Sequence, residues 1–446
     1  MDVTRRRLIL GVTSGGVLGA LGACDLESPD SGDGPDGFGG VPQERGPRID
    51  VLAEGVSADG ISDDTAAMAR LIEKTASAGG GRLLIPKGRM VRVRALKLAS
   101  GVSIVGGGAA SGLTKIGNSA KWITCTRGAR SVILTGLRLE CSVLARASMI
   151  EVSSGVRGFL LDNCEVIDSS RRRTSGLETR DGVVGVWVRN CSFRGQSAAI
   201  KINKDPRGVH VESNSFEGWA QRAIQALGTS ESAVEDITIS RNSIGPNVGN
   251  SSVRQPIQFN GHGDSPFLRV RVVDNTLRGR GTAYSDPISP GTADMISLHE
   301  CHGFEVARNE CSDGGEVGIT IARQCRDGKV TDNRVVRCDS AGIVIGSGST
   351  VVVSDIEVRG NVLTDNGLDR AAKGRPSWAR AGVVVYRGKS VRVVGNRMTN
   401  KRRGHVQEYG VTVTDGEAVD VTENQVSDVS KSKVLRRRSK SGEPKF

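Results

Sequence analysis

Hydrophobic positions along most of the chain follow one short phrase that recurs at nearly regular intervals. Each phrase has two apolar residues separated by one position, then two residues, an asparagine, one residue and another apolar residue, as in residues 237–244. A recurrence of roughly 20 to 50 residues built on a short strand is typical of a solenoid, in which each unit buries its apolar face against its neighbours. The asparagines lie 24 to 35 residues apart: Asn214, Asn242, Asn275, Asn309, Asn333, Asn361, Asn396 and Asn424.

A second short strand of alternating pattern lies about halfway through each period, for example at residues 257–259 and 319–321. Carrying the repeat backwards places Cys191, Cys164 and Leu137 at the asparagine position, so the array begins near residue 102. Two or more parallel strands per coil close into a tube, and a corner asparagine tolerates a left-handed backbone and can pass amide hydrogen bonds to the next coil. The sequence therefore predicts an all-β solenoid, a parallel β-helix of about twelve coils spaced about 4.8 Å apart.

A helix is expected ahead of the array. Asp63 or Asp64 can cap its N-terminus, because short acidic side chains accept hydrogen bonds from the first free amides of a helix. The residues that follow recur at helical spacing, and we expect their side to close the N-terminal end of the tube: Ala67, Met68, Leu71, Ile72 and Thr75.

Two segments near this helix resemble a known family. They are residues 59–67 (DGISDDTAA) and 79–88 (GGGRLLIPKG). Together with the repeats, they resemble the pectin-lyase-like right-handed parallel β-helix superfamily over residues 48–430. The resemblance implies right-handed coils. It also implies a carbohydrate ligand, because the superfamily contains polygalacturonases, rhamnogalacturonases, pectate lyases, alginate epimerases and phage tailspikes.

The N-terminus is interpreted as an export address. Residues 4–10 (TRRRLIL) resemble a twin-arginine signal, and residues 21–24 (LGAC) resemble a lipobox that ends at Cys24. Lipidation of Cys24 would give an exported protein held on the cell membrane, on its periplasmic or extracellular face. The alternative is an ordinary signal peptide in which the cysteine occurs by chance.

Composition divides the rest of the chain. After the signal at residues 1–24, residues 25–47 are rich in Gly and Pro and predict a flexible tether. Residues 48–100 are expected to hold the N-terminal cap and first coils, residues 101–430 the β-helix, and residues 431–446 a basic disordered tail.

Charge narrows the choice of partner. The chain has 61 Lys and Arg against 49 Asp and Glu, a formal net charge of +12. A moderately basic body is compatible with an acidic polysaccharide. Nucleic acid is not expected, because the densest basic run is the tail and the protein is exported. The sequence does not indicate an oligomeric state.

The nine cysteines do not predict a metal site, because none forms a CxxC pair. Cys164 and Cys191 share one ladder position on neighbouring coils, at a spacing that suits either a disulfide or stacked free thiols. Cys301 and Cys325 present the same two alternatives. No cofactor is expected; calcium is compatible with such a protein, but no residues indicate it.

Candidate chemistry lies on the outward side of the second strand of each coil. Its polar members cluster in the middle coils, where longer loops are expected to form walls beside them. The outward positions are Lys201, Gln225, Gln258, Ser297, Thr320, Val344, Val384 and Thr412.

Ionisable and aromatic residues near this row supply the candidate roles. A histidine can act as a general base near neutral pH, cations can neutralise a substrate carboxylate, and aromatic rings can lie against sugars. The catalytic candidates are His262, Asp264, Asp294 and His299, and the substrate-binding candidates are Lys201, Gln225, Gln258, Tyr284, Arg323 and Trp378.

Two classes of function remain open. The first is an enzyme acting on an acidic polysaccharide, as a lyase, hydrolase or epimerase. The second is a binding or scaffold protein of the cell envelope without catalysis. Two carboxylates facing one bond would favour hydrolysis, and a carboxylate beside Lys or Arg would favour elimination or epimerisation.

Overall fold

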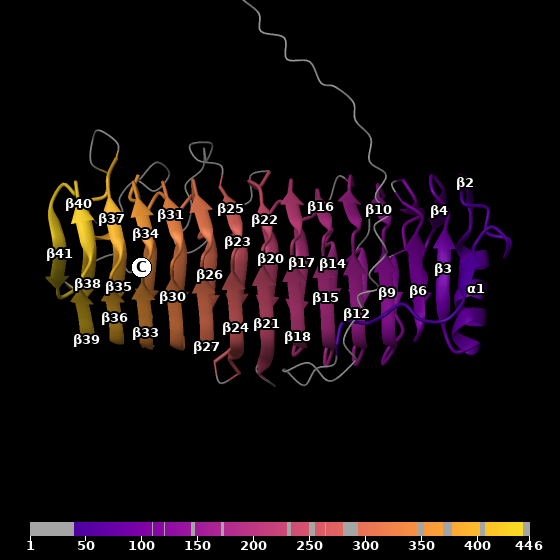
Figure 1. Cartoon of the computed structure of the whole chain (residues 1–446), viewed down its shortest axis with the longest axis horizontal. Helices are drawn as coiled ribbons and strands as arrows, with labels where there is room; N and C mark the ends of the chain where they lie inside the picture. The colour runs from indigo at the N-terminus through magenta and orange to yellow at the C-terminus, as the bar shows by residue number, and fades with distance from the viewer. Residues whose placement is uncertain are drawn as a thin grey trace, which may run out of the picture. The chain divides into compact units, whose positions relative to one another are not determined.

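The computed structural model describes residues 40–439, except 109, 120, 144–147, 171–173, 230–232, 249–254, 264, 280–292, 347–351, 369–376 and 402–405. Cys24 and the export signal lie outside these residues, as do Asp264 and Tyr284. The described residues belong to one compact unit, Asp33–Phe446. They form a right-handed parallel β-helix in which strands of successive coils stack side by side (Figure 1).

Three parallel sheets make the tube, where the sequence had indicated two or more strands per coil. Sheet A has 14 strands: β1 Arg48–Asp50, β3 Gly81–Ile85, β6 Val102–Gly106, β9 Arg130–Thr135, β12 Arg157–Asp162, β15 Val184–Arg189, β18 Arg207–Glu212, β21 Val234–Ser240, β24 Phe267–Val273, β27 Cys301–Ala307, β30 Arg326–Thr331, β33 Val353–Arg359, β36 Gly388–Val394 and β39 Glu417–Thr422.

Sheet B also has 14 strands, all short: β2 Asp59–Asp63, β4 Met90–Val93, β7 Gly112–Lys115, β10 Arg138–Cys141, β13 Glu165–Asp168, β16 Ser192–Arg194, β19 Ser215–Glu217, β22 Ser243–Ile244, β25 Thr276–Arg278, β28 Glu310–Ser312, β31 Arg334–Val336, β34 Val362–Thr364, β37 Arg397–Thr399 and β40 Gln425–Ser427.

Sheet C has 13 strands: β5 Leu96–Leu98, β8 Ile123–Cys125, β11 Ile150–Val152, β14 Leu177–Thr179, β17 Ala198–Asn203, β20 Arg222–Leu227, β23 Gln255–Asn260, β26 Ile296–His299, β29 Ile319–Ala322, β32 Ile343–Gly346, β35 Ala381–Tyr386, β38 Tyr409–Thr414 and β41 Ser432–Arg437. The last strand corrects the prediction of a disordered tail over residues 431–446, because Ser432–Arg437 pairs with β38 and continues the sheet.

The asparagine ladder is confirmed at the corner between sheets A and B. Asn309 Nδ2 donates to Asn333 Oδ1 at 3.0 Å and to the Val272 carbonyl at 2.8 Å. The Asn309 backbone amide donates to the same Asn333 oxygen at 2.9 Å. Equivalent bonds join each asparagine from Asn214 to Asn424. One expectation about this corner is wrong: the left-handed residue is the one before the asparagine, for example Arg308 at φ 52°.

Cysteines continue the ladder toward the N-terminus as free thiols. The Cys191 amide donates to Asn214 Oδ1 at 2.9 Å, and the Cys164 amide donates to Cys191 Sγ at 3.4 Å. At a different corner, between sheets C and A, the Cys301 amide donates to Cys325 Sγ at 3.3 Å. All eight cysteines of the described residues are free and buried, which selects stacked thiols over disulfides. Within the same residues, no cluster of His, Cys, Asp and Glu could hold a metal ion.

Helix α1, Thr65–Ser77, lies at the N-terminal end of the sheets (Figure 1). Its buried residues are the predicted Met68, Leu71, Ile72 and Thr75. Asp64 occupies the N-cap position, but its carboxylate instead accepts the amides of Ser57 and Ala58. The helix of the described chain is too short and too polar to cross a membrane.

Residues 40–47 differ from the predicted free tether. Val41 packs against the apolar outward residues Ile133, Leu160 and Trp187 of sheet A. Pro42, next in the chain, is buried. Burial of this apolar patch explains why the end of the tether follows the surface of the tube.

Candidate functional site

The predicted outward row forms one continuous line across sheet C. Strand pairing places Lys201 beside Gln225, Gln225 beside Gln258, and Gln258 beside Ser297. The line then continues through Thr320, Val344, Val384 and Thr412. The expectation that these residues share one face is therefore confirmed.

The C-terminal end of this row is covered by apolar side chains. Trp378, in the 3-10 helix η2 (Ser377–Ala379), packs in a cluster with Val344 and Val384 and stacks on Tyr386 at a centroid distance of 5.6 Å. Only 5% of Trp378 is exposed. Its ring therefore has no open face for a sugar, which contradicts its expected role in substrate binding.

A hydrogen-bonded polar cluster lies where β23, β26 and β29 end. His299 Nδ1 lies 3.3 Å from Asn260 Oδ1, and Arg323 Nη1 donates to the same oxygen at 3.3 Å. Ser297 Oγ lies 3.2 Å from His299 Nε2. Because the asparagine oxygen only accepts, we assign the ring proton to Nδ1, so that Nε2 accepts from the serine hydroxyl.

Both ring nitrogens of His299 are thus engaged, which changes its expected role. A general base needs a free nitrogen directed at the substrate. Ser297 is fully buried, at 0% exposed, so it is not placed to attack a substrate through the histidine. His299 therefore positions Asn260, and through Asn260 it positions the Arg323 guanidinium.

Left-handed backbone directs two further side chains to the cluster. Glu300 has a φ of 52°, and Arg323 and Gln324 have φ values of 44° and 41°. These residues form the turns from sheet C to sheet A, where the Glu300 amide donates to the Arg323 carbonyl at 3.0 Å. Gly261 permits the close approach, because a Cβ there would lie 2.6 Å from the Glu300 Cβ.

The electrostatics of the cluster follow from burial and from Arg323. Burial, aided by Arg323, lowers the pKa of His299 to about 4, so the ring is neutral at pH 7. Burial raises the pKa of Glu300, against the opposing effect of Arg323, 3.8 Å away, and of His262. Glu300 Oε2 is buried and has no hydrogen-bond partner in the described chain. Such a carboxyl group holds a proton more readily than a free glutamate.

The other catalytic candidates divide between this cluster and other parts of the coil. His262 is exposed and lies near enough to Glu300 for its charge to lower the pKa of that carboxyl group. Asp294 is buried, and its Oδ1 accepts the Val317 amide at 3.3 Å. It precedes β26, which begins at Ile296, whereas His299 ends that strand. The expectation that Asp294 acts together with His299 stays a prediction.

A second ionic cluster occupies the N-terminal half of the same face. The Glu151 carboxylate forms ion pairs with Lys121 Nζ at 2.8 Å and with Arg180 Nη2 at 2.9 Å. Arg180 Nη1 also lies 3.3 Å from Glu178 Oε1. Pairing places Glu151 beside Glu178, and Glu178 beside Lys201. These residues were missed from the sequence, although their outward position in the repeat could have identified them.

Two family models match adjoining parts of the chain. A model described as "Right handed beta helix region" matches residues 269–398, and one described as "Rhamnogalacturonase A/epimerase, pectate lyase-like" matches residues 48–263. No curated protein matches the chain.

Solved structures of similar fold cover most of the chain. The A-module of the mannuronan C-5 epimerase AlgE6 from Azotobacter vinelandii matches with 15% identity and a TM-score of 0.50, over 88% of this chain and 99% of that chain. The Streptococcus pneumoniae surface adhesin PfbA matches with 14% identity and a TM-score of 0.55, over 90% and 94%. The catalytic unit of an α-1,3-glucanase from Streptomyces thermodiastaticus matches with 15% identity and a TM-score of 0.53, over 88% and 70%.

At these identities, the likeness to solved structures concerns the fold. It agrees with the two family models, which follow one another along the tube from its first coil. The chain belongs to the pectate-lyase-like superfamily of right-handed parallel β-helix proteins.

Proposed function

We propose that the protein binds an acidic polysaccharide along sheet C and acts on it by proton abstraction beside a carboxylate. The observation that carries this proposal is the Arg323 guanidinium, which lies 3.3 Å from Asn260 Oδ1 and 3.8 Å from Glu300. Half of the Arg323 side chain is exposed, so it can receive a substrate carboxylate. The mannuronan epimerase and the α-1,3-glucanase show that this fold serves saccharide chemistry.

The proposed roles follow from charge and protonation. Arg323 holds the carboxylate of a uronic acid unit and stabilises the negative charge that forms when the adjacent C–H bond breaks. Glu300 takes that proton through Oε1, the carboxylate oxygen 3.8 Å from Arg323, because its raised pKa makes its ionised form a stronger base than a free glutamate. His262, which is exposed and acts on Glu300 by its charge, is the candidate to protonate a departing glycosidic oxygen. Lys201, Gln225 and Gln258 extend the binding surface along the row.

A screen of the soluble protein against uronate polysaccharides tests this proposal. Elimination would raise ultraviolet absorbance, hydrolysis would release reducing ends without that absorbance, and epimerisation would change the composition of the uronates. Elimination or epimerisation is the expected result. Binding without any turnover would assign the protein to the non-catalytic class, and hydrolysis alone would contradict the proposed roles.

We also propose that Cys24 is lipidated and holds the exported protein on the cell membrane. The motivation is the Leu21-Gly22-Ala23-Cys24 sequence after the arginine pair, Arg5 and Arg6. Cys24→Ser is expected to move the protein from the membrane fraction to the soluble fraction, measured by fractionation and immunoblotting. A variant that stays with the membrane would contradict lipid anchoring.

A further inference from the structure

The outer face of sheet A has a bulge that recurs at the same position in successive strands. The described strands of sheet C have no such row of bulges. One residue in each strand from β9 to β39 has a left-handed backbone, with φ between 51° and 78°. Strand pairing skips these residues on both partners at the same position, so the bend repeats in register from strand to strand. The bulge row comprises Ser131, Gly158, Gly185, Gly208, Asp236, Arg269, Gly303, Asp327, Asp355, Ser390 and Ala418.

A groove follows this bulge row. Two cavities of about 610 and 570 Å³ share Asp327 and Lys329, so they form one trough. The trough reaches from His210 in β18 to Ala418 in β39 and crosses eight neighbouring strands of sheet A. Seven steps between strands make it roughly 34 Å long.

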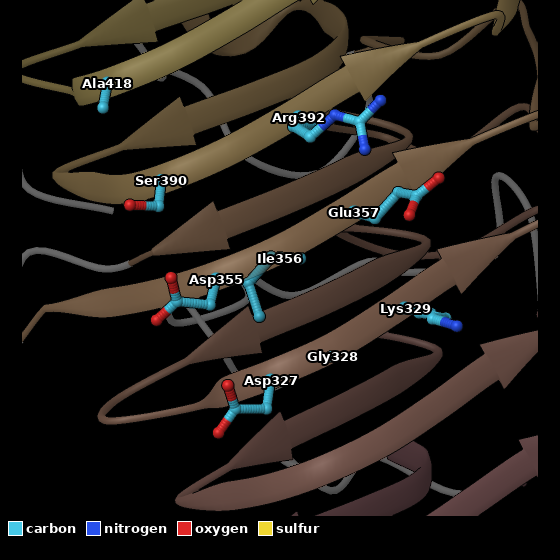
Figure 2. A pocket seen from close by; sticks show the side chains of 9 residues that line it. All are labelled: Asp327, Gly328, Lys329, Asp355, Ile356, Glu357, Ser390, Arg392 and Ala418. Atoms are coloured by element: carbon cyan, nitrogen blue, oxygen red, sulfur yellow. The ribbon is translucent and has the colours of Figure 1, made fainter.

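The bulge row forms the first wall of the groove. Along the second wall, the side-chain charge alternates in sign from one strand to the next. Figure 2 shows Asp327 and Asp355 on one side, with Lys329, Glu357 and Arg392 on the other. Pairing aligns the second wall in the order Arg271, Glu305, Lys329, Glu357, Arg392 and Asp420.

The two ends of the groove differ in whether their charged side chains form ion pairs within the protein. Toward the N-terminus, Arg269 pairs with Asp236 at 2.6 Å, and Arg271 pairs with Glu305 at 3.0 Å. Toward the C-terminus, the side chains of Lys329, Asp355 and Arg392 form neither an ion pair nor a hydrogen bond with another residue that the structure describes. This end therefore offers unused donors and acceptors at every step along the groove.

The near balance of acidic and basic side chains in the groove indicates the charge of the ligand that it can bind. The C-terminal cavity has three carboxylates and two cations, so a polyanion or a polycation would meet like charges at alternate strands. A neutral chain rich in hydroxyl groups can donate to the carboxylates and accept from the cations. Ala418 is exposed and supplies an apolar contact for C–H groups, whereas Ile356 and Phe304 are buried beneath the floor of the groove.

We propose that this groove is a second saccharide-binding site, which takes a neutral oligosaccharide on a sheet separate from the site on sheet C. It does not depend on the reaction proposed there. An extended peptide fits the groove less well, because its residues repeat every 3.4 Å or so and the strands repeat about every 4.8 Å. Charges on such a peptide would fall out of step with the alternating wall.

Calorimetric titration with cellohexaose, laminarihexaose and maltohexaose tests the proposal, and hexagalacturonate serves as the acidic probe. At least one neutral probe is expected to bind the wild type. Lys329→Gln and Asp355→Asn preserve side-chain size and are each expected to weaken that binding about tenfold. Arg397→Ala is the control, since Arg397 is an exposed arginine of β37 on sheet B, outside both cavities. It is expected to leave affinity unchanged.

Arg323→Ala separates this site from sheet C, and it is expected to leave binding of the neutral probe unchanged. The proposal is overturned if none of the three neutral probes binds, or if Arg323→Ala abolishes their binding while Lys329→Gln and Asp355→Asn do not. Binding of an alternating Lys–Glu peptide, with no binding of the neutral probes, would assign the groove to a protein partner instead. None of these outcomes depends on turnover at sheet C.

Discussion

Asn309→Leu is expected to lower the free energy of unfolding by about 2 to 6 kcal/mol, which is roughly 1 to 3 kcal/mol for each of two orphaned buried groups. One group is the Asn275 amide, which donates to Asn309 Oδ1 at 3.0 Å. The other is the Val272 carbonyl, which accepts from Asn309 Nδ2 at 2.8 Å. Urea unfolding followed by circular dichroism measures the change.

Asn424→Leu is the matched control, because Asn424 ends the ladder in a part-buried environment. Water can reach the groups that this change leaves without partners, so a smaller loss is expected. Equal losses at Asn309 and Asn424, or no loss at Asn309, would contradict the contribution assigned to the buried ladder.

Glu300→Gln is expected to lower turnover of the substrate polysaccharide at least a hundredfold, because an amide cannot accept the proton. Stability should respond in the opposite direction. The raised pKa of Glu300 means that the protonated form stabilises the fold, and that this contribution is lost as pH rises through the folded-state pKa. A neutral glutamine should therefore leave the protein at least as stable at pH 7.

Kinetics and thermal unfolding on the same preparation check both effects. In the wild type, turnover should fall as pH decreases through the raised pKa of Glu300, at a higher pH than for a free glutamate. Glu310→Gln is the control, because Glu310 is an exposed carboxylate on sheet B. Full activity in Glu300→Gln would remove Glu300 from the mechanism.

The fold was largely predictable because, in a solenoid, residues at equivalent positions of the sequence repeat contact one another in neighbouring coils. Each asparagine of the phrase bonds its equivalent in the next coil, so spacing alone identified the partners of Asn309. The left-handed residue before each asparagine was not predicted. Residues such as Arg308 and Asp274 occupy this position, and neither is a glycine that would indicate a positive φ. The strand Ser432–Arg437 was missed because its charged residues suggest a solvated tail, whereas its backbone extends sheet C.

The site was predictable only in part, for reasons of geometry. Alternation along a strand correctly placed Gln258 and Ser297 on one face. Closeness in sequence suggested that Asp294 acts with His299, but Asp294 precedes β26 and His299 ends it. Two successive left-handed residues bring Arg323 to Asn260, and no residue type at those positions reveals such a turn.

The groove on sheet A was not predicted. Its charged residues alternate between neighbouring strands and therefore lie far apart in sequence, as Lys329 and Glu357 do. The bulge that forms one wall places Asp355 and Ser390 outside the strand pairing, so the alternation of apolar and polar residues does not identify them.

In the proposed function, Arg323, held by Asn260 and through it by His299, recognises a substrate carboxylate. The most direct measurement compares affinity for a set of uronate polysaccharides with affinity for their methyl esters, in the wild type, Arg323→Ala and His299→Ala. The wild type should prefer at least one free uronate about tenfold, and both variants should lose that preference. A preference that persists in Arg323→Ala, or a wild type that binds no uronate, would contradict the account.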